Sequence, residues 1–214
     1  VETPAEKLLN YVTGNDGIIV DGNINLSIDG FDIGLGLKGS ISLADLENVA
    51  VNADLDITID GETLNASVSY VDGVIALDAL NNHFKLATDN VLDFINMLPT
   101  YGIQLELPEE FSNLDIDALT NQLGDIKEED KKQYSNGEYY FPFSFLGLDI
   151  GIKTDADEKD RFLGARIDNA PLMGIGLSAD VNITSASKEE LNIVDPLKGE
   201  YADKYVDFKY AFNL

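Results

Sequence analysis

The segment FDIGLGLKGSISL, residues 31–43, limits the possible folds more than any other part of the chain. Apolar residues recur at every second position from Phe31 to Leu43, with Gly39 completing the pattern. Polar residues and glycines stand between them. A period of two is typical of a β-strand that has one apolar face. Because an ordinary strand has about 5–6 residues, this segment predicts an unusually long strand in an extended sheet.

The same alternation continues in the neighbouring segments GIIVDGNINLSID, VAVNADLDITID and TLNASVSYV, and again in MGIGLSADVNIT. Asp60-Gly61 and Asp72-Gly73 are strong signals for hairpin turns between such strands, and Asn81-Asn82 predicts a further turn. One side of each segment is apolar, and the other carries mostly Asp, Asn, Ser, Thr and Gly. This division is typical of an antiparallel sheet with one covered face and one face in water.

Three segments have helical signals instead. Residues 4–13 follow Thr3 as N-cap, with Glu6 in position to complete a capping box. Residues 88–98 and 115–123 place their apolar residues at helical spacing. We therefore predict a mainly β (α+β) protein, in which a large curved antiparallel sheet, a half-barrel, is covered by helices. Glycines within the long strands permit the bend.

The predicted organisation is a single domain over residues 1–214. The likeness of GFDIGLGLKGS to GLDIGIKTDAD suggests a weak internal duplication of strand blocks 17–87 and 137–184. The polar run 127–138 is predicted to be an exposed loop, and YVDFKYAF near the C-terminus is a candidate closing strand.

The net charge of the chain argues against polyanionic partners. The chain has 14 Lys and Arg against 39 Asp and Glu, which gives a formal net charge of −25. Such a field repels nucleic acid and anionic membrane surfaces. Without cysteine there is no disulfide or thiolate chemistry, and no segment approaches the roughly 20 apolar residues of a transmembrane helix. Because the chain begins at Val1 and not at Met, we expect that an export signal has been removed.

The residues offer little for catalysis. His83 is the single histidine and lies beside a predicted turn, where a solvated side chain is expected. Asp54 and Asp56 share one strand face, as a carboxylate pair for glycoside hydrolysis would, but such pairs arise by chance in so acidic a chain. We predict no catalytic residue and no cofactor.

The acidic segment 155–160 resembles the beginning of a calcium-binding loop. It lacks the glycine at the sixth position, and Arg166 stands where the acid at the twelfth would be. A solvated hairpin tip is therefore the expected structure, and no metal site is predicted.

A resemblance to a known family rests on three stretches: PAEKLLNYV, the strand series 17–79 and YVDGVIALDALNNHFKLATDNVLDFINML. In order of elements they resemble the bacterial lipoprotein-carrier fold of the LolA, LppX and LprG type. That resemblance implies an incomplete barrel that encloses an apolar cavity plugged by helices. It supplies no individual acyl-chain contact that can be transferred to this chain.

These observations lead to one functional hypothesis: a non-enzymatic envelope or cell-surface protein that holds a lipid or other apolar ligand on the concave side of the sheet. An acylated protein is a further candidate ligand. The predicted location is extracytoplasmic, in the envelope or secreted, with a lipid anchor before residue 1 as one option. The predicted lining residues are Phe31, Ile33, Leu35, Leu37, Leu55, Ile57, Ile175 and Leu177, with Phe143 and Phe145 near the mouth.

The alternative is a surface interaction or structural module that binds a protein or glycan and has no internal cavity. In that case the apolar face is ordinary core. The aromatic run YYFPFSF, residues 139–145, is then ordinary core as well. Pro142 favours an edge strand or bulge for this run.

Overall fold

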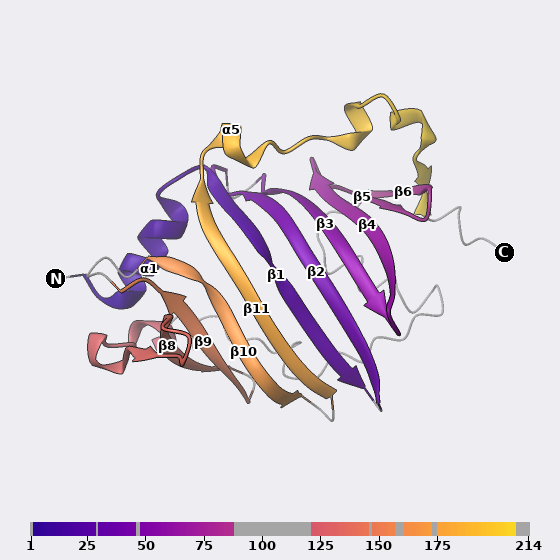
Figure 1. Ribbon diagram of the computed structural model, residues 1–214. Coiled ribbons are helices and arrows are strands. Elements are labelled where there is room, and N and C mark those ends of the chain that lie inside the picture. Colours follow the sequence, from indigo (N-terminus) through magenta and orange to yellow (C-terminus); the bar gives the residue numbers. More distant parts are fainter. Residues whose placement is uncertain are drawn as a thin grey trace.

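The computed structural model describes residues 2–28, 30–45, 48–87, 121–145, 147–156, 161–172 and 175–208. One large sheet dominates them (Figure 1). Its strands are β1 (Gly17–Ile28), β2 (Phe31–Ser42), β3 (Ala50–Ile59), β4 (Glu62–Val71), β5 (Val74–Ala79), β6 (Asn82–Ala87), β7 (Lys132–Gln133), β8 (Tyr139–Phe145), β9 (Leu148–Thr154), β10 (Phe162–Leu172), β11 (Ile175–Ala186) and β12 (Val206–Asp207). The spatial order is β12-β6-β5-β4-β3-β2-β1-β11-β10-β9-β8-β7, so the described sheet is open, with β12 and β7 at its edges. The predicted fold class, a mainly β protein with one large curved antiparallel sheet, is confirmed.

The helical elements are α1 (Pro4–Thr13), α5 (Lys188–Leu191) and the 3-10 turns η2 (Glu128–Asp130), η3 (Pro196–Lys198) and η4 (Ala202–Lys204). The predicted capping box of α1 is confirmed. The Thr3 backbone N–H donates to the Glu6 carboxylate at 2.7 Å, and the Glu6 N–H donates to Thr3 Oγ1 at 3.3 Å. None of the described helices is both long enough and apolar enough to cross a membrane.

Residues 121–124, which include the end of the predicted helix 115–123, are helical. The rest of that helix and the whole of the predicted helix 88–98 lie outside the described residues. That these two helices cover the sheet remains a prediction.

Tight turns connect β3 to β4 and β4 to β5, as predicted. Asp60 and Gly61 have φ angles of 51° and 83°, and Asp72 and Gly73 have 50° and 75°. Positive φ at both central residues matches the right-handed twist of the flanking strands. The turn predicted at Asn81-Asn82 is displaced by one residue, because Leu80 and Asn81 take the positive φ angles and Asn82 begins β6. The Asn82 side chain donates to the Leu80 carbonyl and closes the turn there.

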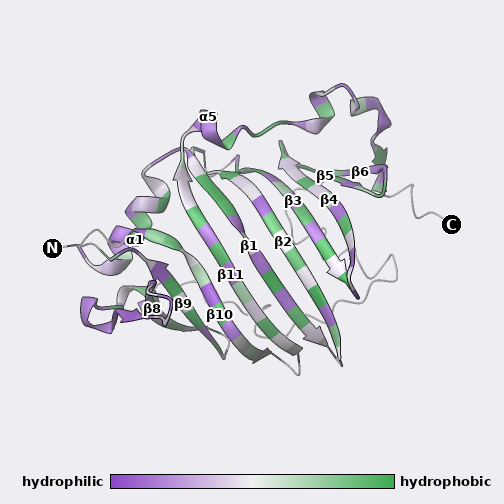
Figure 2. Cartoon of the chain, in the orientation of Figure 1, coloured by the Kyte–Doolittle hydropathy of each residue, from purple (hydrophilic) through white to green (hydrophobic). Residues whose placement is uncertain are grey.

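The register separates the sheet into an apolar face and a polar face. One row on the apolar face consists of Phe141, Ile152, Ala165, Val181, Gly22, Leu37, Leu55, Ala66 and Ala79. A row on the polar face consists of Asn182, Asp21, Lys38, Asp54, Ser67, Asp78 and His83. Directly paired residues point to the same side of a sheet. The strands accordingly alternate in hydropathy along their length (Figure 2).

One group of buried apolar residues gathers at one end of the apolar face. Leu8 of α1, Ile126, Phe141 and Ile152 form a buried cluster, against which Leu123, Phe143 and Phe162 pack. Hence α1 and the segment 121–126 cover this end of the apolar face, with α1 next to β10 and β11 and its Leu8 reaching β8 and β9. Elsewhere on this face Ala66 of β4 and Leu86 of β6 are buried, and on the polar face Ala76, Leu191 and Tyr205 are buried where the C-terminal segment crosses the sheet.

Residues 187–205, here called the C-terminal strap, run from the end of β11 to the β6 edge (Figure 1). The Asn52 side chain on β3 holds the strap by two hydrogen bonds to Val194, donating to its carbonyl at 3.0 Å and accepting from its N–H at 2.7 Å. Further along, the Tyr205 hydroxyl donates to Asp78 Oδ2 at 2.6 Å. The strap then enters β12, which pairs with β6 in parallel. The candidate closing strand is therefore confirmed for Val206–Asp207.

The polar run 127–138 is more ordered than predicted. It contains η2 and the edge strand β7, whose Lys132 and Gln133 pair with Tyr140 and Tyr139 of β8. Pairing with β8 supplies backbone hydrogen-bond partners that the hydrophilic composition of the run does not indicate. The run is mostly exposed, as predicted, whereas the prediction of irregular structure is wrong for Glu128–Asp130 and Lys132–Gln133.

Candidate functional site

The predicted lining residues lie on the apolar face wherever their side chains are described. Ile33, Leu35 and Leu37 alternate along β2, and they pair with Ile59, Ile57 and Leu55 of β3. On the other side of β1, Leu177 of β11 pairs with Leu26. Ile175 is the first residue of β11, and its side chain lies outside the described part. The register therefore brings residues from distant strands onto one surface.

This surface is half-buried at the centre of the sheet. The apolar patch, as we name it, consists of Ile24, Leu26, Ile33, Leu35, Leu37, Leu55, Ile57, Leu64 and Leu177, all of intermediate exposure. Within the described part of β1, β2 and β3, no large apolar side chain is fully buried. The patch runs from β11 to β4 and is about 19 Å wide at about 4.8 Å per strand.

Three predicted residues occupy different positions. Phe31 begins β2 and is 58% exposed, so it lies at the end of the sheet and not in the patch. Phe143 packs against the buried cluster under α1, with Phe145 stacked on it at a ring separation of 6.5 Å. Pro142 lies on the second strand from the edge, beyond the two residues that pair with β7. This position agrees with the expectation that Pro142 favours an edge.

His83 differs from its prediction as a solvated turn residue. It belongs to β6, is half-buried, and its Nδ1 lies 2.5 Å from Oδ1 of Asp78. The rings of Tyr205 and Tyr201 flank it at 5.3 and 6.5 Å. His83 is half-buried because the strap folds over β5 and β6. The sequence around His83 does not reveal this covering segment. Its Asp78 partner also accepts the Tyr205 hydroxyl, so this group anchors the strap.

The acidic candidates are engaged in structural contacts. Asp54 accepts a hydrogen bond from Ser67 Oγ at 2.7 Å, and Asp56 accepts one from the Asn65 side chain. Asp155 pairs with Arg161 at 2.5 Å across the β9–β10 connection, while residues 157–160 lie outside the described part. Among the described residues, no three acidic or histidine side chains converge as a metal site would require.

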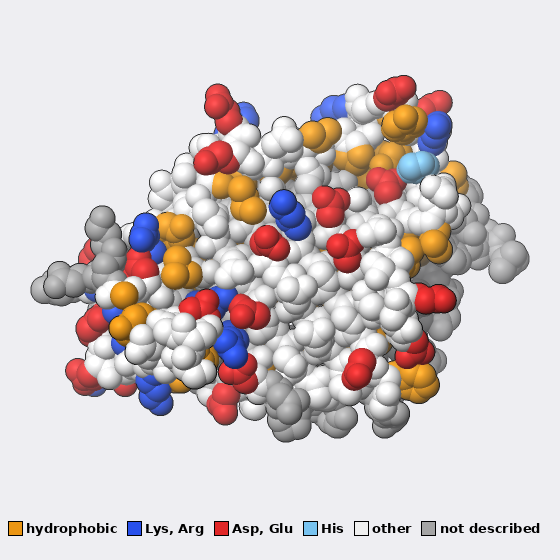
Figure 3. Space-filling view, in the orientation of Figure 1, with side chains coloured by type: hydrophobic (Ala, Val, Ile, Leu, Met, Phe, Trp, Pro, Cys, Tyr) orange, Lys and Arg blue, Asp and Glu red, His pale blue; other side chains and the backbone are white. Residues whose placement is uncertain are grey.

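The polar face contains three cavities that the sequence analysis missed. One, of about 470 Å³, lies between the strap and the sheet, with Asp54, Asp78 and Leu191 in its lining. A second, of about 630 Å³, lies over β1, β2 and β3, with Asn23, Gly36 and Asp56 in its lining. The third, of about 620 Å³, opens over β8, β9 and β10, with Tyr134, Tyr140 and Arg166 in its lining. Figure 3 shows this face, where hydrophobic side chains are sparse over the central strands and charged ones are scattered.

Burial perturbs two tyrosines on the polar face. It raises the pKa of Tyr134 to about 12, with a smaller contribution from the negative charge of Asp168. Burial also raises the pKa of Tyr205, reinforced by its hydrogen bond to Asp78. Both phenols therefore stay protonated and available as hydrogen-bond donors at neutral pH.

Comparisons with known proteins give structural neighbours but no sequence relatives. No protein-family model matches the chain, and no curated protein sequence matches it. Among solved structures, the chain is similar to LprF from Mycobacterium bovis, with a TM-score of 0.44 and 10% identity over 90% of this chain and 96% of that chain. It is also similar to a DUF1329 family protein from Desulfovibrio piger, with a TM-score of 0.33 and 9% identity over 93% of this chain and 97% of that chain.

Proposed function

We propose that the protein is a non-enzymatic binding protein of the bacterial envelope or cell surface, and that it holds a lipid or another apolar ligand against the apolar patch. The observation that supports this most directly is the half-buried state of the patch. A continuous apolar surface of this breadth is unusual on a soluble protein unless it meets a ligand, a membrane or another protein. The buried cluster under α1, by contrast, has the character of ordinary core.

Burial of hydrocarbon supplies the affinity in this proposal. Each buried methylene contributes roughly 0.8 kcal/mol, so about ten methylenes contribute roughly 8 kcal/mol before the cost of immobilising the ligand. No reaction is required, which accords with acidic side chains that are engaged with neighbours. An acyl chain, free or attached to a protein, has the required chemistry.

Two measurements test the proposal directly. Organic extraction of the purified protein followed by mass spectrometry is expected to recover a co-purified apolar molecule. Titration of the delipidated protein with a fluorescent fatty acid is expected to show saturable binding. If both measurements fail, the lipid hypothesis is wrong, and the alternative of a ligand-free interaction module takes its place.

A matched pair of variants locates the site. Leu55→Asn places an amide in the patch, whereas Leu80→Asn makes the same change in the β5–β6 turn, where Leu80 is 71% exposed. We expect Leu55→Asn to weaken fatty-acid binding and Leu80→Asn to leave it unchanged. Leu55→Trp, which adds volume without polarity, is expected to weaken binding in the same way. Equal affinity in all three variants would place the ligand elsewhere.

A further inference from the structure

A hollow on the polar face lies beside Pro142 and Gly151, which are neighbours on two paired strands. Pro142 of β8 pairs with Gly151 of β9, and Gly151 pairs in turn with Arg166 of β10. Pro142 extends no long side chain above the sheet, and the Tyr134 side chain covers Gly151. The open cavity has a volume of about 620 Å³. It lies on the face opposite the apolar patch, so it is independent of the proposed lipid site.

One wall of the hollow is aromatic and fixed in place. The rings of Tyr134 and Tyr140 stack with centroids 3.9 Å apart and planes 16° apart. Tyr134 covers Gly151 so closely that a Cβ at that position would collide with its hydroxyl. The Arg166 guanidinium lies 4.6 Å from the centroid of Tyr134. The Tyr134 ring thus contacts Tyr140, Arg166 and Gly151, and these three contacts hold the aromatic wall in one orientation.

The other walls alternate hydrogen-bond donors and acceptors. Arg166 Nε donates to Asp168 Oδ1 at 2.8 Å, which holds the guanidinium and leaves further N–H groups directed elsewhere. Ser144 and Asp149 face each other across β8 and β9. With Lys132 and Arg166 against Asp149 and Asp168, the charged side chains lining the hollow balance. That balance is unusual in a chain with a net charge of −25.

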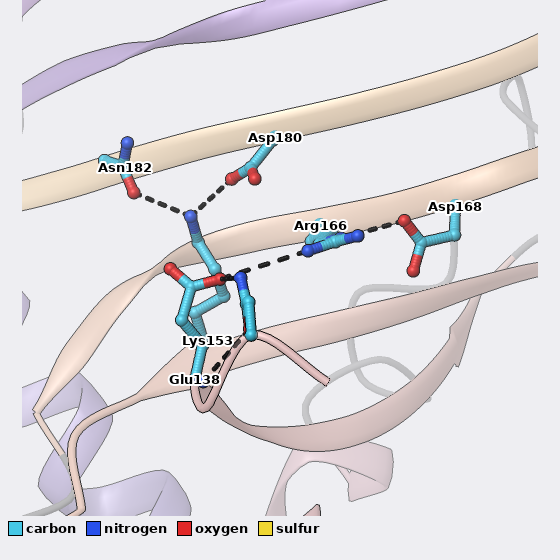
Figure 4. Close-up of polar contacts among 7 residues, drawn as sticks. Glu138, Lys153, Arg166, Asp168, Asp180 and Asn182 are labelled. Carbon is cyan, nitrogen blue, oxygen red and sulfur yellow. Dashed lines mark hydrogen bonds and ion pairs between the residues drawn. The ribbon is translucent and has the colours of Figure 1, made fainter. Parts of the chain in front are cut away.

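A second layer of polar contacts supports the hollow from the side of β11 (Figure 4). The Lys153 side chain is 3% exposed, and its Nζ donates to Asp180 Oδ1 at 2.5 Å and to Asn182 Oδ1 at 2.6 Å. Glu138, which follows Tyr134 in the β7–β8 connection, lies 3.9 Å from the Arg166 guanidinium. These contacts tie β9 to β11 and the β7–β8 connection to β10 next to the hollow.

We propose that this hollow binds a neutral saccharide. A sugar ring presents apolar C–H faces, which fit the Tyr140 ring and the Pro142 floor, and neighbouring hydroxyls, which both donate and accept. The paired Arg166 and Asp168 offer a donor and an acceptor side by side, as do Ser144 and Asp149. The balanced charge selects against strongly acidic ligands. A cavity of about 620 Å³ accommodates one or two sugar rings.

The experiment uses the full chain and a panel of neutral oligosaccharides of hexoses and N-acetylhexosamines. Binding is first screened on a glycan array and then measured by NMR chemical-shift titration. We expect Tyr140→Ala and Asp149→Ala each to lower affinity about tenfold, the equivalent of about 1.4 kcal/mol. Asp56→Ala is the control, because Asp56 lies on the same face but outside the hollow. It is expected to bind like the original chain.

Tyr140→Phe removes only the hydroxyl and keeps the ring, so it separates loss of the aromatic face from misfolding. It is expected to retain most of the affinity. The proposal is overturned if no neutral saccharide binds at millimolar concentration. It is also overturned if the two test variants bind as well as Asp56→Ala, or if a cationic peptide binds the hollow while the sugars do not. Fatty-acid titration of the same variants is expected to be unchanged, which keeps this result separate from the lipid proposal.

Discussion

Replacement of Phe141 tests whether the end of the sheet under α1 is the core that holds the fold together. Phe141 is 0% exposed and packs with Leu8, Ile126 and Ile152. A change from Phe to Ala at such a position removes the buried ring and leaves a cavity, at a cost of about 3–5 kcal/mol. For a domain of this size, 1 kcal/mol corresponds to about 2–4 °C in melting temperature. We therefore expect Phe141→Ala to lower the free energy of unfolding by about 4 kcal/mol and the melting temperature by about 8–16 °C.

Phe31→Ala is the matched control, because the same side chain is removed from a position that is 58% exposed. Its expected cost is below about 1 kcal/mol. Urea unfolding of the delipidated protein, followed by far-ultraviolet circular dichroism, suits a chain without tryptophan. If Phe141→Ala costs less than about 1.5 kcal/mol, or no more than Phe31→Ala, the cluster is not the core that the burial indicates.

Three further predictions concern single polar groups. Thr154 Oγ1 is buried and has no hydrogen-bond partner among the described residues, so Thr154→Val should leave the urea midpoint unchanged or raise it; a clear loss would reveal a hidden partner. Asp180→Ala leaves the nearly buried Lys153 with Asn182 alone, and we expect a loss of about 2–3 kcal/mol in urea unfolding, less than for a fully buried pair because Asp180 is half exposed; a loss no larger than that of Asp56→Ala would contradict this. The pKa of Tyr134 is raised to about 12, mainly by burial, whereas an unfolded tyrosine titrates near pH 10. The folded state therefore binds more protons between about pH 10 and 12, and stability falls as the pH rises through that window. Tyr134→Phe should reduce this slope in unfolding curves measured across the window, and an unchanged slope would show that Tyr134 is not perturbed.

The strands and turns could be predicted because their signals are local. Alternation in residues 31–43 and the paired positive-φ turns at Asp60-Gly61 and Asp72-Gly73 depend on near neighbours. The face of each lining residue followed from the same alternation, since a period of two fixes the side on which Leu35 or Leu55 lies. The half-buried state that these lining residues share could not be predicted from the alternation, because it depends on which elements cover the sheet.

The polar face could not be predicted for a related reason. The hollow requires Pro142, Gly151 and Arg166 to be neighbours, and this depends on a cross-strand register that the sequence does not reveal. The strap depends on Asn52 meeting Val194, which is 142 positions later in the chain. The surroundings of His83 could not be predicted either, because Tyr205, which flanks it, lies 122 positions later in the chain. The duplication of blocks 17–87 and 137–184 stays a prediction.

The pairing of β1 with β11 has a consequence for how the chain folds. Apart from this seam and the short β12, each strand pairs with its sequence neighbour, so each half of the sheet consists of local hairpins. The seam joins Gly17 to Ala186 and continues to Ser27 and Gly176. Local contacts form early, whereas contacts between distant segments form slowly because a long loop must close first. We expect two separately formed halves to unite along β1 and β11 in the slow step of folding.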